Sequence, residues 1–110
     1  MCLENNIAPI LLTLPAINPD NIQHIFKEKT APDWLQRFAA VNAYIRTQVY
    51  IDTAAAIESP GGRLPTIYGL DGLHPDASGK KLMGEKINAV WPQVKLLADR
   101  QLVKAQNPEE

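Results

Sequence analysis

The sequence predicts an α/β fold with parallel strands, and two observations carry that prediction. Residues Ile7 to Leu14 form a nearly continuous apolar run, which is typical of a strand buried on both faces of a parallel sheet. A helical pattern and a second strand-like segment follow it, and strand–helix–strand units are usually parallel and right-handed. Because two strands are too few for a stable doubly wound sheet, we expect the chain to form part of a larger one.

Composition excludes several classes of protein. The chain has 110 residues, 45% of them hydrophobic and 21% charged, which suits a single globular domain. A formal net charge of −1 argues against a nucleic-acid binder. No apolar run approaches the roughly 18 residues of a membrane span, and no signal-peptide pattern is found. Cys2 is the lone cysteine, so no internal disulfide is expected.

The first strand, Ile7 to Leu14, ends at Pro15, and Asn18 to Asn21 is typical of a turn-rich loop. A helix is then predicted from Asp33 to about Thr47. Its apolar stripe recurs at spacings of four, three and four and is expected to face a sheet. The stripe consists of Trp34, Phe38, Val41 and Ile45.

The second strand is predicted at Val49 to Asp52, where β-forming residues gather. A brief helical turn at Ala54 to Ile57 follows, and Ser59 to Gly62 breaks it. Asp76 is a good N-cap for a helix that runs from Ala77 towards Val90.

The last helix is expected to be interrupted at Pro92, which lacks an N–H and clashes with the preceding turn. Pro92 should therefore kink or restart the helix, which then continues from Gln93 to roughly Lys104. The polar tail, from about residue 105 to 110, is expected to be disordered.

The most informative segment is a Gly-rich turn in which Asp71 precedes His74 by three residues. A carboxylate next to an imidazole can fix its tautomer and stabilise the imidazolium, which is the supporting half of a hydrolytic triad. A blander interpretation makes His74 a turn histidine bonded to backbone, and Asp71 a carboxylate that stabilises the turn at Gly72. The isolated pattern leaves both interpretations open.

The surroundings of this turn carry a resemblance to a known family. Asp71-Gly72-Leu73-His74-Pro75, followed by Ala77 to Met83, resembles the last motif block of the SGNH (GDSL-type) hydrolases. Ile10 to Pro15 resembles the fourth strand of that family, and Val49 to Asp52 resembles its fifth. The resemblance covers roughly residues 5 to 90. It implies that residues 1–110 are the C-terminal part of a three-layer α/β/α, flavodoxin-like domain.

The resemblance also implies a chemistry, the hydrolysis of an acyl ester or of a carbohydrate acetyl ester, without a cofactor. His74 would be the catalytic general base and Asp71 its catalytic partner. The nucleophile block (Gly-Asp-Ser), the oxyanion-hole glycine block and the Gly-x-Asn-Asp block would precede the fourth strand. Met1 is accordingly expected to be an internal methionine of a longer protein.

A nucleophile is not predicted within the sequence. Its only serines are Ser59, in a Ser-Pro-Gly-Gly turn, and Ser78, in the first turn of a helix. Neither has the strand-to-helix elbow that exposes a nucleophilic serine. We therefore expect little or no esterase activity from the chain alone. The alternative is a non-catalytic remnant or interaction module, whose strand Ile7 to Leu14 pairs through its open edge with the missing N-terminal half or with a second copy.

Other candidate residues favour structural roles. His24 is expected to face solvent and Asp52 to cap a turn, although each lies where it could approach a site. Trp34 and Trp91 fit helix stripes better than a sugar-stacking platform. Two distant histidines do not match zinc-ligand spacing, so no metal is expected, and the glycine pairs lack the context of a phosphate loop.

Overall fold

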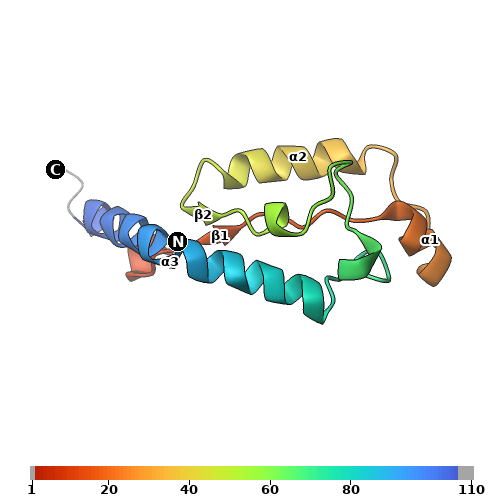
Figure 1. Cartoon of the computed structure of the whole chain (residues 1–110). Coiled ribbons are helices and arrows are strands. Elements are labelled where there is room, and N and C mark those ends of the chain that lie inside the picture. The colour runs from red at the N-terminus through yellow and green to blue at the C-terminus, as the bar shows by residue number, and fades with distance from the viewer. Residues whose placement is uncertain (1, 107–110) are drawn as a thin grey trace.

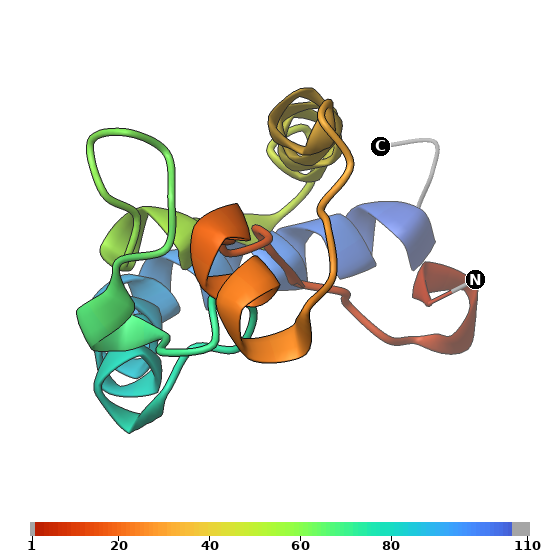
Figure 2. The same ribbon diagram turned by 90° about the vertical axis from the view of Figure 1, so that its right-hand side faces the viewer.

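A computed structural model describes residues 2–106 and shows a mixed α/β fold (Figure 1). Over these residues it contains a two-stranded parallel sheet and three α-helices. In chain order the elements are η1 (Leu3–Asn5), β1 (Leu11–Leu12), α1 (Pro19–Phe26), α2 (Trp34–Ile45), β2 (Tyr50–Ile51), η2 (Ala54–Ala56), η3 (Thr66–Tyr68) and α3 (Ala77–Gln106), where η marks a 3-10 helix. Seen from two directions, α2 and α3 lie on opposite sides of the strands (Figures 1 and 2).

The two strands are parallel, as predicted, with Leu11 opposite Tyr50 and Leu12 opposite Ile51. Both are shorter than predicted: β1 is confined to two residues of the apolar run from residue 7 to 14. Regular pairing needs a partner on at least one side, and β2 is the described partner of β1. The extent of the first strand was therefore predicted wrongly, although its position and its direction relative to the second strand are confirmed.

The edge of β1 that faces away from β2 is closed at one point by a side chain. The N–H groups of Leu11 and Thr13 point to β2, so those of the alternate residues Leu12 and Leu14 point the other way. At Leu14, the side-chain amide of Asn42 fills both backbone positions. Its Oδ1 accepts the Leu14 N–H at 2.7 Å, and its Nδ2 donates to the Leu14 carbonyl at 3.2 Å. Asn42 thus pairs with β1 as the peptide group of a neighbouring strand would.

Helix α2 agrees with the predicted bounds to within two residues at either end. Trp34 and Phe38 are half-buried and pack edge to face, with ring centroids 5.5 Å apart and an interplanar angle of 87°. Ile45 is buried. Val41 is exposed, contrary to prediction, because Asn42 is the neighbouring residue that turns towards β1.

Helix α1 begins where the sequence predicted a loop. The Asn18 side chain accepts the N–H of Asn21 at 3.4 Å, and Pro19 occupies the first helical turn. Asparagine at an N-cap and proline at N1 both favour a helix start, so the residues interpreted as a turn are in fact a cap. The helix ends at Lys27, whose left-handed backbone (φ 60°) directs its N–H to the Gln23 carbonyl.

Helix α3 runs without interruption through Pro92, so the predicted restart there is wrong. Proline removes one intrahelical bond, and the buried positions Val94 and Ala98 hold the following turns against the rest of the fold. The predicted cap is confirmed, because Asp76 Oδ1 accepts the Gly79 N–H at 3.0 Å. Residues 105 and 106 belong to the helix rather than to a disordered tail, while 107–110 lie outside the described residues.

The molecule is elongated, with extents of 54 × 27 × 23 Å and a radius of gyration of 16.6 Å. A compact domain of this length has a radius of gyration of about 13 Å. Ile51, Ile57 and Leu64 are the centre of the buried core, against which α3 packs through β2, η2 and η3. The fold therefore buries a small core and leaves much apolar surface in contact with water.

Candidate active site

The Asp71–His74 turn joins η3 to α3 and rests against the start of α1. The Asn18 N–H donates to the Gly72 carbonyl at 2.8 Å, and the Asp76 N–H donates to the Tyr68 carbonyl at 2.7 Å. Gly72 has a positive φ of 82°, and a Cβ there would come within 2.4 Å of the Asn18 carbonyl oxygen. Only glycine permits both that conformation and that approach. The turn is thus fixed at both ends and at its centre.

Three hydrogen bonds of 2.8 Å end on the carboxylate of Asp71. Its Oδ1 accepts the backbone N–H groups of Leu73 and His74, and its Oδ2 contacts Nδ1 of His74. The backbone N–H of His74, its ring and the N–H of Leu73, in that order, lower the pKa of Asp71 from 3.8 to about 2. Asp71 is therefore a negatively charged carboxylate at neutral pH.

The charge on Asp71 decides the tautomer of His74. An ionised carboxylate can only accept hydrogen bonds, so the 2.8 Å contact requires that Nδ1 of His74 carries the proton. In the neutral ring, Nε2 is then the unprotonated nitrogen, which can accept a proton. The His74 side chain is 70% exposed, so this nitrogen is available to a reacting group.

The structure therefore brings together the two residues that the sequence singled out. The His74 ring bonds to the Asp71 carboxylate rather than to backbone, which is the arrangement that a base and its carboxylate partner need. Asp71 also stabilises the turn through its two bonds from backbone N–H groups, as the structural interpretation of Asp71 expected. The geometry fits the abstraction of a proton by His74 Nε2.

A shallow hollow of about 360 Å³ opens beside this pair. Its lining consists of Ile25, Leu70, Asp71, His74 and Asp76. Ile25 comes from α1, about fifty positions before His74 in the chain, and it was not among the residues that the sequence pattern singled out. His24, the neighbouring residue that the sequence did consider, is exposed and is not part of the lining.

Neither serine lines this hollow. The Oγ of Ser59 accepts the backbone N–H of Arg63 at 3.2 Å and so stabilises its own turn. Ser78 is exposed in the first turn of α3. Within residues 2–106, the lining of the hollow thus contains His74 and Asp71 but no serine.

Asp52 acts at the end of the sheet rather than in the hollow. Its Oδ1 accepts the Thr13 hydroxyl at 2.9 Å, and it forms an ion pair with Arg46 at 3.3 Å. The Thr13 Oγ1 in turn accepts the N–H of Ala54 at 3.0 Å. This network joins the ends of β1 and β2, so the contacts of Asp52 are structural, although they link the strands rather than cap a turn as expected.

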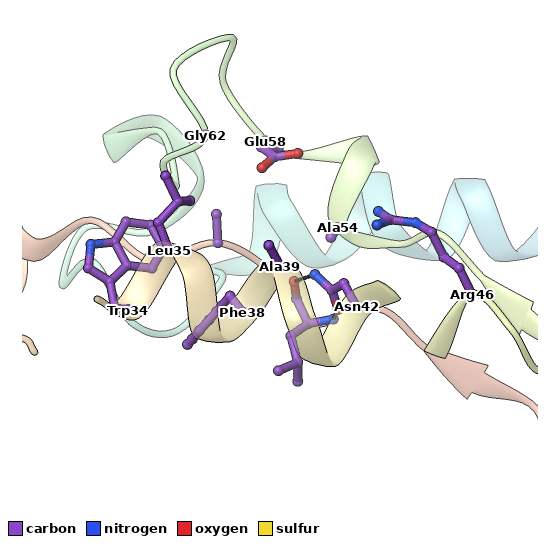
Figure 3. Close-up of a pocket in the computed structure, with 11 residues that line it drawn as sticks. Trp34, Leu35, Phe38, Ala39, Asn42, Arg46, Ala54, Glu58 and Gly62 are labelled. Atoms are coloured by element: carbon purple, nitrogen blue, oxygen red, sulfur yellow. Dashed lines mark hydrogen bonds between the residues drawn. The ribbon is translucent and has the colours of Figure 1, made fainter. Parts of the chain in front are cut away.

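A second hollow, of about 220 Å³, lies between α2 and the segment from residue 54 to 62 (Figure 3). Figure 3 shows Trp34 at one end of the hollow and Arg46 at the other, with Glu58 on the segment across from Phe38. It shares no lining residue with the hollow beside His74. Trp34 contacts Phe38 edge to face, as a packed helix residue does, in line with the interpretation that it belongs to a helix stripe.

The described part of the chain contains no group of three His, Cys, Asp or Glu residues placed to hold a metal ion. None of its helices has both the length and the apolar character to cross a membrane.

Comparison of the chain with protein-family models, curated proteins and solved structures gave no match.

Proposed function

We propose that Asp71 and His74 form the acid–base half of an SGNH (GDSL-type) ester hydrolase, which acts on an acyl ester or a carbohydrate acetyl ester. One observation carries the proposal: an ionised carboxylate contacts Nδ1 of an exposed histidine at 2.8 Å beside an open hollow. The sequence around the pair, Asp-Gly-Leu-His-Pro followed by a capped helix, supports the choice of family.

In this proposal His74 Nε2 takes the proton of a serine hydroxyl as that oxygen attacks the ester carbonyl. His74 then returns the proton to the leaving alcohol. Asp71 holds the ring in the required tautomer and stabilises the imidazolium that forms in between. The serine and the oxyanion-hole donors, which are often worth about 3–4 kcal/mol of barrier, would come from a further polypeptide segment.

Three features of the fold favour such a completing segment beside β1. The outer backbone groups of Leu12 face away from β2, and its side chain is 44% exposed. Helices already lie on both sides of the strands (Figure 1), as in a three-layer flavodoxin-like domain, of which this chain would be the C-terminal part. The radius of gyration of 16.6 Å, above the value of a compact domain, indicates a small core that further strands in the same sheet would enlarge.

An esterase assay with p-nitrophenyl acetate tests the proposal. We expect little or no turnover by the chain alone, and turnover once it associates with the N-terminal half of an SGNH hydrolase, which carries the Gly-Asp-Ser block. His74→Ala should abolish that turnover by at least about a thousandfold, whereas His24→Ala, at the other histidine, should leave it unchanged. If the chain alone hydrolyses the ester and His74→Ala abolishes that activity, the claim that the nucleophile comes from a further polypeptide segment is refuted. Association without turnover would refute the hydrolase function.

The open edge of β1 favours a second candidate function, an interaction module. Ile7, Leu12 and Leu14 leave apolar surface exposed along this segment, and an unpaired edge is a template for another strand. Light scattering over a range of concentrations tests for pairing with a second copy. A mass that rises with concentration, and that falls to the monomer value in Leu12→Lys, supports this function. A concentration-independent monomer that also fails to bind the N-terminal half contradicts it.

A further inference from the structure

We infer that the hollow beside His74 receives the alcohol portion of the ester, and that this portion is uncharged and apolar. The inference rests on the proposed function and goes beyond it, because it assigns Ile25 and Leu70 as specificity residues for the leaving group. The substrate would be an ester of an aliphatic alcohol rather than of a sugar or of a phosphorylated alcohol.

The path of the proton places the alcohol beside His74. When serine Oγ bonds to the carbonyl carbon, its proton moves to His74 Nε2. When the bond from that carbon to the alcohol oxygen breaks, the proton moves from Nε2 to this oxygen, and the acyl group stays on serine. The alcohol oxygen must then lie within about 2.6–3.2 Å of Nε2. Its substituent consequently lies next to the His74 ring, where the hollow is.

Two walls of the hollow beside His74 are apolar. Ile25 contributes one wall from the last turns of α1, and Leu70 contributes another from the loop after η3. Both side chains are large, hydrophobic and exposed. Covering them with an aliphatic group removes apolar surface from water, which is favourable in proportion to the area covered.

These walls are held in place relative to His74. The side-chain amide of Asn21 donates to the Thr66 hydroxyl at 3.0 Å, which joins α1 to η3. The bond from the Asn18 N–H to the Gly72 carbonyl joins the start of α1 to the turn that carries His74. The position of Ile25 is thus tied to the base by two contacts on the same side of the fold.

The charge of the lining disfavours an anionic alcohol. Besides His74, the remaining lining residues are the acidic Asp71 and Asp76, and no lysine or arginine belongs to the lining among the described residues. Like charges repel, so a phosphate on the alcohol is disfavoured. The Nδ1–H of His74 is used by Asp71, and the two carboxylates accept hydrogen bonds but cannot donate them. The lining side chains therefore offer no free donor to the hydroxyl oxygens of a sugar.

Methyl NMR on the chain alone tests the site without requiring catalysis. We expect 1-hexanol to shift the methyl resonances of Ile25 and Leu70 and the ring resonances of His74, and hexyl phosphate or methyl glucoside to bind at least about tenfold more weakly. Leu70→Ser should weaken 1-hexanol binding about fivefold or more. Ile67→Ser is a matched control, because Ile67 is 70% exposed against 69% for Leu70 and does not line the hollow.

A second measurement separates the inference from the function on which it rests. In the completed enzyme, Leu70→Ser should flatten the dependence of kcat/KM on alcohol length in a series of acetate esters. It should leave the dependence on acyl length in a series of ethyl esters unchanged. Absence of 1-hexanol binding by the folded chain overturns the inference even where esters are hydrolysed, as does a change confined to the acyl series. Binding of 1-hexanol by the chain, with no turnover after association with the N-terminal half, upholds the apolar site and instead overturns the hydrolase function.

Discussion

Replacing Asp71 by asparagine measures how much the carboxylate charge contributes to the fold. The pKa of Asp71 is lowered from 3.8 to about 2 by two backbone N–H groups and the His74 ring. A group whose pKa is lower in the folded state stabilises the fold above its unfolded pKa, and this stabilisation is lost as the pH falls through the folded pKa. The difference corresponds to roughly 2 kcal/mol. Because the side chain is 28% exposed, we expect about 1–2 kcal/mol after screening by water.

Urea unfolding followed by tryptophan fluorescence supplies the measurement, since Trp34 and Trp91 are the reporters. Asp71→Asn keeps an acceptor oxygen for the backbone bonds and removes the charge. At pH 7 it should lower the free energy of unfolding by about 1–2 kcal/mol, and the difference from the parent chain should shrink between about pH 4 and pH 2.

Asp99→Asn is the matched control for the loss of a paired carboxylate. Asp99 pairs with Lys95 at 2.7 Å on the exposed surface of α3, so its replacement should change the free energy of unfolding by less than about 0.5 kcal/mol. A loss at Asp71 no larger than the loss at Asp99, or one that stays constant down to pH 2, would refute the account of a charge-stabilised turn.

Three further predictions concern backbone and edge contacts, each measured by urea or thermal unfolding. Gly72→Ala should lower the free energy of unfolding by at least about 2 kcal/mol, because the added Cβ meets backbone at 2.4 Å. Gly84→Ala, which has open space in a helix, should instead raise it by about 0.5–1 kcal/mol. Equal effects of the two substitutions would contradict the packing described. Asn42→Ala should lower the free energy of unfolding by about 1–2 kcal/mol, because two hydrogen bonds to Leu14 are lost. Asn88→Ala, at an exposed helix position, should not lower the free energy of unfolding. Pro92→Ala should raise stability by up to about 3 kcal/mol, and a lower melting temperature by circular dichroism would show that proline is needed there.

Local signals explain what could be predicted of the fold. The apolar stripe located α2, and Asp76 marked the start of α3, because each pattern depends on residues a few positions apart. The start of α1 was missed because Asn18 and Pro19 are favoured both in turns and at helix N-termini. The restart expected at Pro92 failed because packing on both sides of a proline can outweigh its local cost, which no window of sequence contains.

The candidate site also combines residues that are close in sequence with residues that only the tertiary fold brings together. Asp71 and His74 are three residues apart in one turn, so their contact could be predicted from spacing alone. Ile25 reaches the same hollow only because α1 folds back onto Gly72, and such an approach depends on the tertiary fold. The length of β1 could not be predicted either, because it is determined by how far its partner extends along it.

The contact between Asn42 and Leu14 sets a length limit on the sheet. A strand that joined the outer edge of β1 would find the backbone groups of Leu12 open and those of Leu14 occupied by a side-chain amide. Its pairing would have to stop before Leu14, so a helix residue determines the register at which the incoming chain leaves the sheet. Residues that follow such a strand would then emerge at a fixed level, beside the Thr13–Asp52 network. The side-chain amide of Asn42 on α2 would thus limit how far a completing strand can pair along β1.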